Sequence, residues 1–477
     1  MSIAIPTGVF DILPEDPKEA GRESHLWNYL ETVFRSHATA YGCHEIRTPI
    51  FERTELFTRS VGDETDIVSK EMYTFEDRGG RSISLRPEGT APVMRAFIEK
   101  QLHAQSHLHR FFYLGPIFRY ERPQSGRFRQ HHQFGVEVIG SPHPEADAEM
   151  IEMLYSLLKR LGIQHVNVYI NSLGDKAARE QFRNALCAYL KPHLPQMSEE
   201  SQRRFTTNPL RILDSKDERD KEIVSKAPSI LEFLSEESRV KFECVQKILR
   251  HLDIPFQVND RLVRGLDYYN NTVFEFTSGH LGAQNSIAGG GRYDGLLKAL
   301  GGPDLSSIGF GSGIERIIQV LLQQKQTAHL QRPKPALYVI ALGEAAGLAA
   351  MTLVARLRKE GITALLDLSR KKVKACMQEA NALGAEYALV LGDNELQQQR
   401  VELKHMPTAR VVPMSLEAVP FFLQMQALSG RLYSDFETMQ NACTEVCRDS
   451  HLVEEHMKEQ FSHLAQKATT LLNSIKR

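Results

Sequence analysis

Residues 111–139 read FFYLGPIFRYERPQSGRFRQHHQFGVEVI, with β-branched and aromatic residues at both ends and a polar segment between them. Two such runs joined by a polar loop are typical of an antiparallel pair of strands. We therefore predict a hairpin that pairs Phe111–Gly115 with Val136–Ile139. From Arg110 to Arg129 this region carries five arginines and one acid, Glu121. Concentrated positive charge is thus expected on an antiparallel sheet.

The segments on either side predict helices and further strands. Pro17–Ala40 and Glu145–Leu161 place apolar residues at helical spacing. From Asn171 to about Pro255 the sequence is helical in pattern, charged and poor in glycine, which indicates a helical insertion that interrupts the sheet. Strand-like sequence returns at Thr272–Thr277, and Ser312–Gln323 predicts an apolar helix that closes the unit.

A second architecture follows the proline-rich linker Gln331–Pro335. Strand patterns alternate there with helical patterns, as in the βαβ units of a small doubly wound α/β domain. The strands are expected at 337–342, 363–366 and 387–391, and the helices at 346–360 and 371–383. Beyond about Gln426 the apolar residues from Met439 to Ile475 step mostly by three and four. This spacing predicts a helical tail, as a coiled coil or a helical hairpin.

Composition narrows the class of protein. The 477 residues suggest about three domains, and 42% hydrophobic with 25% charged residues is typical of a globular chain. The six cysteines form no CxxC pair, which fits a reducing compartment better than a disulfide framework. Neither a signal peptide nor an apolar run of roughly 18 residues is visible. We therefore expect a cytoplasmic protein with no membrane segment.

The net charge of −1 does not by itself indicate a nucleic-acid binder. However, basic residues gather in two places, the arginine-rich loop and the stretch from Arg356 to Lys374. Segregated charge of this kind is compatible with two contacts to one polyanion. Ordinary solvated faces would have the same composition, so the clusters alone leave both interpretations open.

Two further segments carry groups suited to a small polar substrate held against a phosphate. Arg264-Gly265-Leu266-Asp267-Tyr268-Tyr269 places a cation, an acid and two phenols ahead of a strand. Glu88, beside Gly89 and Thr90, is either a helix cap or a ligand for an ammonium group. Arg119 is either a phosphate clamp through bidentate bonds or a structural partner of Glu121.

In order along the chain, these segments resemble the histidyl-tRNA synthetases, which are class II aminoacyl-tRNA synthetases. Phe118–Gln133 matches the second class II motif and Gly309–Arg316 the third, while Ile46–Glu52 matches the first, which forms a dimer interface. Arg264–Tyr269 and the glycine-rich Ala288–Leu296 match the two histidine-specific motifs. The resemblance covers residues 1 to about 426.

The resemblance implies a fold and a reaction. The fold is an α+β catalytic domain with an antiparallel sheet and flanking helices, a helical insertion and a C-terminal α/β anticodon-binding domain. The expected parts are 1–170 and 257–328 for the catalytic domain, 171–256 for the insertion, 333–426 for the anticodon domain and 427–477 for the tail. A homodimer would use ATP and Mg²⁺ to form an adenylate of L-histidine, and would then charge tRNA-His.

The resemblance also implies residue roles. Arg119 and Arg264 would act on the α-phosphate as the catalytic residues, and the protein itself is not expected to supply a metal site. The histidine-binding residues would be Glu88, Gly89, Thr90, Gln133, Glu137, Tyr268 and Tyr269. The ATP-binding residues would be Arg119, Arg127, His131 and Arg316, and the tRNA acceptor end would meet Arg122, Gln124 and Arg127. Within the histidine set, the Glu137 carboxylate and the Tyr269 phenol would read the two imidazole nitrogens.

The chain departs from the family pattern at three places. The first is the lack of an arginine before Gly8. The second is His131, which stands where a phenylalanine usually stacks on adenine, so we predict weaker binding of ATP with unaltered chemistry. The third is the tail at 427–477, which is expected to be a helical appendage rather than an RNA-binding element, since it has seven acids against six basic residues.

Two other classes share parts of this pattern. A regulatory paralogue that binds histidine without catalysis would lack the Arg264–Tyr269 element and the anticodon domain, and both are present. A nucleic-acid sensor built on a degenerate synthetase fold is disfavoured because Arg119, Arg264 and Arg316 are all retained. The sequence therefore favours the enzyme.

Overall fold

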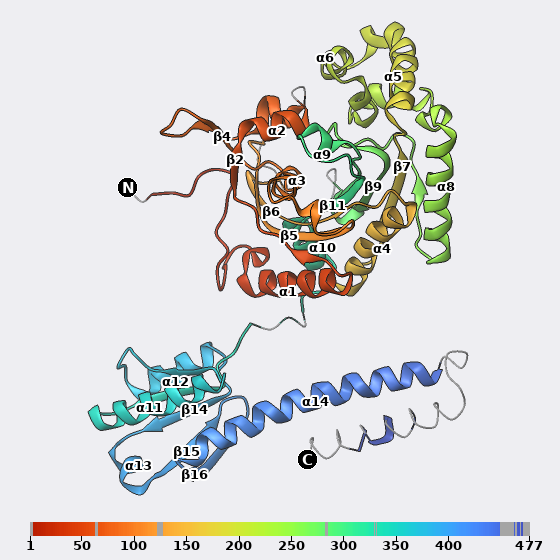
Figure 1. Cartoon of the computed structure of the whole chain (residues 1–477). Coiled ribbons are helices and arrows are strands. Elements are labelled where there is room, and N and C mark those ends of the chain that lie inside the picture. The colour runs from red at the N-terminus through yellow and green to blue at the C-terminus, as the bar shows by residue number, and fades with distance from the viewer. Residues whose placement is uncertain are drawn as a thin grey trace. The chain divides into compact units, whose positions relative to one another are not determined.

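The computed structural model describes residues 3–62, 65–121, 127–281, 285–328, 330, 332–448, 462, 465–467 and 469–470, with only the backbone for much of 430–448. The chain divides into two compact units, Met1–Gln331 and Arg332–Arg477 (Figure 1). The fold class expected from the sequence is confirmed: an α+β unit with a helical insertion, then an α/β unit that continues into a helix. In the part of the chain that the structure describes, no helix is long and apolar enough to cross a membrane.

An eight-stranded sheet forms the centre of the first unit, in the order β1-β5-β6-β11-β10-β9-β7-β8. The strands are β1 (His44–Glu45), β5 (His109–Phe118), β6 (Gln130–Ile139), β7 (Val166–Ser172), β8 (Gln257–Val258), β9 (Asn270–Ser278), β10 (Ser286–Arg292) and β11 (Ser307–Gly313). The hairpin prediction is confirmed, since β5 and β6 pair antiparallel with Phe111 opposite Glu137. From β5 to β7 every neighbouring pair is antiparallel.

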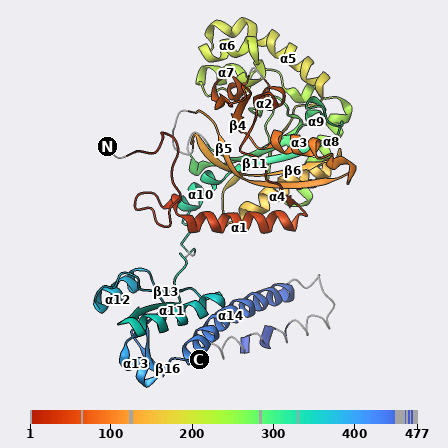
Figure 2. The ribbon, with the colours of Figure 1, turned by 60° about the vertical axis from the view of Figure 1, so that its left-hand side comes forward.

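Helices cover both faces of this sheet (Figure 1, Figure 2). One core joins the sheet to α1 (Ser24–Ala40), α4 (Pro144–Arg160), α8 (Glu236–His251) and α10 (Ile314–Gln323). Within it, the rings of Phe34 and Phe134 stack at 4.9 Å. The other core includes α3 (Thr90–Glu99) and residues of the insertion. The helix expected from Pro17 begins at Ser24 instead, because the preceding residues form only the short turn η1 (Ala20–Arg22).

A small three-stranded sheet, β2-β4-β3, lies in the region of the first class II motif. It contains β2 (Phe51–Arg53), β3 (Thr74–Glu76) and β4 (Ser82–Leu85), with α2 (Thr54–Val61) and η2 (Ile67–Glu71) between them. The remaining short elements of the unit are η3 (Leu102–Ala104), η7 (Gly279–Leu281) and α9 (Leu296–Ala299).

The insertion consists of helices, as predicted. In order they are α5 (Lys176–Leu190), η4 (Lys191–Gln196), α6 (Glu199–Thr207), η5 (Pro209–Asp214), α7 (Glu218–Ser225), η6 (Ile230–Phe233) and α8. The fully buried Asp220 holds three of these segments together, since its Oδ2 accepts bonds of 2.6 Å from the hydroxyls of Ser198, Ser201 and Ser215.

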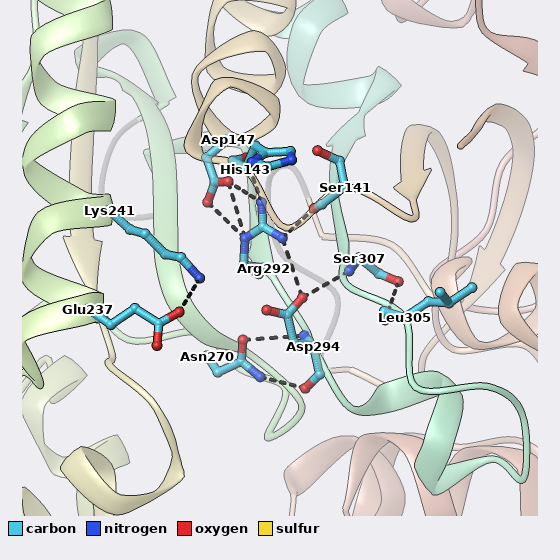
Figure 3. Close-up of polar contacts among 10 residues, drawn as sticks. All are labelled: Ser141, His143, Asp147, Glu237, Lys241, Asn270, Arg292, Asp294, Leu305 and Ser307. Carbon is cyan, nitrogen blue, oxygen red and sulfur yellow. Dashed lines mark hydrogen bonds and ion pairs between the residues drawn. The ribbon is translucent and has the colours of Figure 1, made fainter. Parts of the chain in front are cut away.

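A buried ion pair fixes the glycine-rich strand β10 to the start of α4 (Figure 3). The Arg292 guanidinium donates to both carboxylate oxygens of Asp147 and, at 2.8 and 3.2 Å, to the carbonyls of Ser141 and His143. Arg292 and Asp147 are 4% and 1% exposed. Asp294 accepts a further bond from Arg292 and one from the Ser307 amide. This arginine therefore has a structural role.

The second unit is built on a five-stranded sheet in the order β13-β12-β14-β15-β16. Its elements are β12 (Leu337–Ala341), α11 (Glu344–Lys359), β13 (Ala364–Leu366), α12 (Val373–Ala382), β14 (Tyr387–Leu391), α13 (Asp393–Gln398), β15 (Arg400–His405), β16 (Val411–Ser415) and α14 (Ala418–Arg448). The predicted strands β12, β13 and β14 are parallel, whereas the antiparallel pair β15–β16 was not predicted.

Helix α14 links this unit to the tail and is continuous from Ala418 to Arg448. Helix α14 anchors its first turns through the buried Val419 and Leu423 and then runs past residue 426, where the tail was expected to begin. Gln440 donates from Nε2 to the hydroxyl of Thr469 at 2.8 Å. This contact places Thr469 beside α14, which favours the helical hairpin, one of the two predicted arrangements.

Candidate active site

One cavity of the first unit gathers most of the arginines that the sequence singled out. Its wall includes Arg119, Arg127, His131, Gln133, Arg264 and Arg316. These residues come from the end of β5, the start of β6, the loop before β9 and helix α10, so the antiparallel sheet brings together side chains that lie far apart in the sequence. Several guanidiniums around one polar cavity suit a polyphosphate ligand.

Arg119 follows β5 directly and is held by the backbone. Its Nε donates to the carbonyl of Pro87 at 2.7 Å, which leaves the terminal nitrogens of the fork for other partners. Arg127 forms an ion pair with Glu121 at 3.0 Å across the arginine-rich loop. In the structure the Glu121 carboxylate pairs with Arg127, whereas Arg119 bonds to the backbone of Pro87.

The Arg264 side chain reaches the cavity by crossing strand β10 at Gly289, which has no side chain. A Cβ at Gly289 would lie 2.4 Å from the nearest nitrogen of the Arg264 guanidinium, so a larger residue there would displace the guanidinium. Nη1 of Arg264 pairs with Glu275 at 3.0 Å. The glycine-rich strand therefore admits an arginine instead of forming a dinucleotide loop.

Arg316 and His131 lie on the same wall. Arg316 donates from Nη1 to the carbonyl of Ser286. Burial, together with the charges of Arg119, His132 and Arg316, lowers the pKa of His131 to about 3. The His131 ring is thus uncharged at neutral pH.

The carboxylate of Glu137 is the centre of a buried polar network next to the cavity. Glu137 is 1% exposed, and it accepts a bond of 2.7 Å from the Thr90 hydroxyl and another from the Tyr293 hydroxyl. A Cβ at Gly309 would lie 2.1 Å from its Oε2, so the neighbouring strand leaves room for the carboxylate. Burial raises the pKa of Glu137 to about 8.

Tyrosine rings enclose this network. Tyr268 lies with its ring centre 4.7 Å from that of Tyr269 and 5.5 Å from that of Tyr293. The ring of Tyr113 passes within 2.2 Å of where a Cβ would stand at Gly89 and at Gly135. Burial raises the pKa of Tyr269 to about 12, so its hydroxyl stays protonated.

Glu88 acts as a cap in this structure. Its two oxygens accept the amides of Thr90 and Ala91, both at 2.7 Å, at the start of α3. A carboxylate can accept about four hydrogen bonds, so these two leave acceptor capacity for an ammonium group. Thr90, which was predicted to help Glu88 bind the ammonium group, donates its hydroxyl to Glu137 instead.

The predicted site residues thus fall into three groups. Arg119, Arg127, His131, Gln133, Arg264 and Arg316 share the cavity, whereas Glu88, Gly89, Thr90, Glu137, Tyr268 and Tyr269 belong to the adjoining network. Arg122 and Gln124 lie outside the described residues. Sequence reasoning missed Tyr113 and Tyr293, although Tyr293 lies within the glycine-rich run Ala288–Leu296.

His131 and His132 do not share a site. His132 turns to the other side of the strand, where its amide and Nδ1 contact Glu315 at about 3.0 Å and its ring lies 4.9 Å from that of Trp27. Within the ranges that the structure describes, no group of three or more His, Cys, Asp or Glu residues could hold a metal ion.

Comparison with known proteins identifies relatives along most of the chain. A family model described as histidyl-tRNA synthetase matches residues 8–317, and one described as anticodon binding domain matches 336–426. The histidine–tRNA ligase of Protochlamydia amoebophila is 56% identical over 418 residues, 87% of this chain and 98% of that protein. That of Anoxybacillus flavithermus is 48% identical over 419 residues, 87% of this chain and 97% of the relative. The crystal structure of the apo Staphylococcus aureus histidyl-tRNA synthetase has a TM-score of 0.74 and 36% identity, covering 88% of this chain and all of that one.

Proposed function

Since the chain belongs to the histidyl-tRNA synthetase family, we propose that its arginine-lined cavity binds ATP and that the Glu137 network binds the imidazole of histidine. The chain is a histidine–tRNA ligase: it activates histidine with ATP and transfers the histidyl group to tRNA. One observation supports the residue assignment above all others. Guanidiniums from separate elements converge on one cavity beside a buried carboxylate held by two hydroxyls.

In the first step, a carboxylate oxygen of histidine attacks the α-phosphorus of ATP, and the bond to the β-phosphate breaks to release pyrophosphate. Arg119 and Arg264 stabilise the charge that develops on the α-phosphate, and Arg316 binds the γ-phosphate. Arg264 exchanges its partner Glu275 for this phosphate. Fixed cations of this kind lower the barrier by electrostatic stabilisation rather than by proton transfer.

Histidine binds with its imidazole against Glu137 and Tyr269 and with its ammonium near Glu88 and Gln133. The carboxylate accepts from a ring N–H, while a phenol donates to the other nitrogen. A site that pairs both nitrogens rejects analogues that lack them by about 10⁴-fold or more, which removes the need for editing.

Mg²⁺ accompanies the nucleotide in this proposal. Magnesium in nucleotide sites takes one or two carboxylates together with phosphate oxygens. Glu121 and Glu275, which line the adjoining pocket that shares Arg119 and Arg264 with the cavity, are the carboxylates that would hold it. When bound, the ion neutralises phosphate charge.

In the second step the terminal ribose hydroxyl of tRNA-His attacks the acyl carbon and AMP leaves. The phosphate oxygen of the adenylate takes the hydroxyl proton, since no protein base is assigned. Arg122, Gln124 and Arg127 contact the acceptor end. The α/β domain at 333–426 binds the anticodon through the basic run at Arg370–Lys374.

We further infer a cytoplasmic homodimer. Ile50, Phe51 and Phe75, in and beside the small three-stranded sheet, are 45–51% exposed, which supports an interface at the first class II motif. Catalytic parts at 1–170 and 257–328 are separated by the insertion at 171–256, and the tail occupies 427–477.

Histidine-dependent exchange of pyrophosphate into ATP tests the proposal. Wild-type protein should catalyse it, and Arg264→His should lower kcat by about 100-fold or more, as loss of a preorganised charge contact does. Arg183→His, an exposed arginine on α5, is the matched control and should leave the rate unchanged. An intact rate in Arg264→His would refute the assignment of Arg264.

A further inference from the structure

The histidine-specific run Arg264–Tyr269 is a loop, yet it carries three of the groups assigned to substrates: Arg264, Tyr268 and Tyr269. Neither a helix nor a strand fixes its backbone, since β9 begins only at Asn270. A loop that positions catalytic groups needs support from elsewhere, because a displacement of about 1 Å can cost 100-fold in rate. The structure shows where this support comes from.

The helical insertion supplies it through Arg179 on α5. The half-buried Arg179 guanidinium donates from Nη1 to the carbonyl of Tyr269 at 2.6 Å and to that of Asp267 at 3.4 Å. One cation thereby spans the backbone on both sides of Tyr268. The short bond to the Tyr269 carbonyl also fixes the residue from which the Tyr269 ring enters the pocket.

A second residue of the insertion, Asn208, forms a hydrogen bond with a side chain of the same loop, Asp267. Asn208, between α6 and η5, donates from Nδ2 to Oδ1 of Asp267 at 2.8 Å. On the opposite side, the Asp267 amide donates to the carbonyl of Val61 at 3.3 Å. A Cβ at Gly62 would lie 2.8 Å from Oδ2 of Asp267, so the loop is in close contact with α2 there. The loop is held between the insertion and the catalytic unit.

The insertion is tied to the same part of the catalytic unit by charge. Asp66, just before η2, pairs with Arg204 at 3.6 Å and with Arg211 at 3.4 Å. Arg204 lies on α6 and Arg211 on η5, on either side of Asn208. These ion pairs keep Asn208 within reach of Asp267.

We propose that Arg179 is a positioning residue for histidine binding, and that the insertion holds the Arg264–Tyr269 loop in its substrate-binding conformation through Arg179 and Asn208. The inference rests on the proposed role of Tyr268 and Tyr269 in the histidine pocket. It assigns to the insertion a part in binding the amino acid.

The test is pyrophosphate exchange with Arg179→Met, which keeps much of the volume and removes the donors. The KM for histidine should rise about 10- to 100-fold, the effect of losing a charge-assisted bond, while the KM for ATP stays within about twofold. Arg179→Lys, which retains one donor group, should lie between wild type and Arg179→Met. Arg183→Met, one turn further along α5 and exposed, is the matched control.

If Arg179→Met does not fold, the same exchange assay is carried out with Asn208→Ala, which removes the other contact between the insertion and the loop. It should raise the KM for histidine about 3- to 10-fold, because the lost bond to the Asp267 carboxylate is exposed to water and is therefore weaker than a buried one, with an unchanged KM for ATP. An unchanged KM for histidine in the folded variants, or equal increases in both KM values, would overturn the inference. Exchange by wild-type protein is measured alongside, so that failure of the proposed function itself is recognised separately.

Discussion

At the scale of single residues, two positions decide how the site treats its ligands. His131 stands on the cavity wall as an uncharged ring, and Glu137 is a buried carboxylate with an elevated pKa. Both depend on burial, which disfavours the charged form of each group. Each leads to a measurable consequence.

His131→Phe should strengthen ATP binding, because a benzene ring offers more stacking area to adenine than an imidazole ring. Aromatic pairs contribute about 0.5–1.5 kcal/mol, so the KM for ATP should fall about 2- to 10-fold. The KM for histidine in the same exchange assay is the internal control and should not move. An ATP KM equal to that of wild type would show that His131 does not stack on the base.

Glu137→Gln should weaken histidine binding in a pH-dependent way. The ionised carboxylate accepts the imidazole N–H best, and kcat/KM reports the pKa of the free enzyme. The ratio of wild-type to variant kcat/KM for histidine should therefore rise as pH increases toward about 8 and then level off. Titration of histidine itself affects both proteins and cancels in the ratio. A ratio independent of pH would contradict the assignment.

The same shift affects stability. The folded chain holds the Glu137 proton from the ordinary value of 4.5 up to about 8, whereas the unfolded chain releases it at 4.5. The free energy of unfolding should thus decrease as pH rises through this window. Glu137→Gln removes this decrease, so the variant should gain stability relative to wild type toward pH 8.

At the scale of elements, the junction between β10 and α4 determines whether the glycine-rich strand stays in place (Figure 3). Arg292 and Asp147 are nearly inaccessible to water and bond to each other. A buried pair of this kind costs much desolvation and is tolerated because its members satisfy each other.

Asp147→Ala should lower the free energy of unfolding by about 3–5 kcal/mol, because it leaves a buried guanidinium without its counter-charge. Unfolding in urea can be monitored by tryptophan fluorescence. The signal reports on the first unit, which contains Asp147, because Trp27 is the only tryptophan of the chain and is 3% exposed. The double variant Asp147→Leu with Arg292→Met should lose less than the sum of the single changes. Strict additivity would argue against the coupling.

At the scale of the whole molecule, the chain combines a catalytic unit with an α/β unit whose last helix, α14, continues into the tail. The anchors of α14, Val419 and Leu423, precede the predicted start of the tail. The tail has no excess of basic residues with which to neutralise phosphates.

A chain that ends at Gln426 should therefore keep its function. Exchange activity should equal that of the full chain, and the KM for tRNA-His should change by less than about threefold, since no net phosphate neutralisation is lost. A large loss of tRNA affinity with normal exchange would instead make the tail an RNA-binding element.

Local sequence patterns were enough to predict much of the secondary structure and the residue types of the candidate site. The apolar and polar alternation around the arginine-rich loop predicted the hairpin β5–β6, and the linker with its βαβ pattern predicted the parallel strands of the second unit. Residue type alone also indicated which side chains suit phosphate and imidazole. These features are local because periodicity and turn chemistry act over a few residues.

Only the tertiary structure decided which distant groups meet. Tyr293 bonds to Glu137 across 156 residues, and Arg179 bonds to the Tyr269 carbonyl across 90 residues. It also turned Thr90 toward Glu137 and paired β15 with β16. A sequence pattern states which face a residue occupies, but the packing of separate elements determines its partner, because those contacts form only when the sheet and the insertion come together.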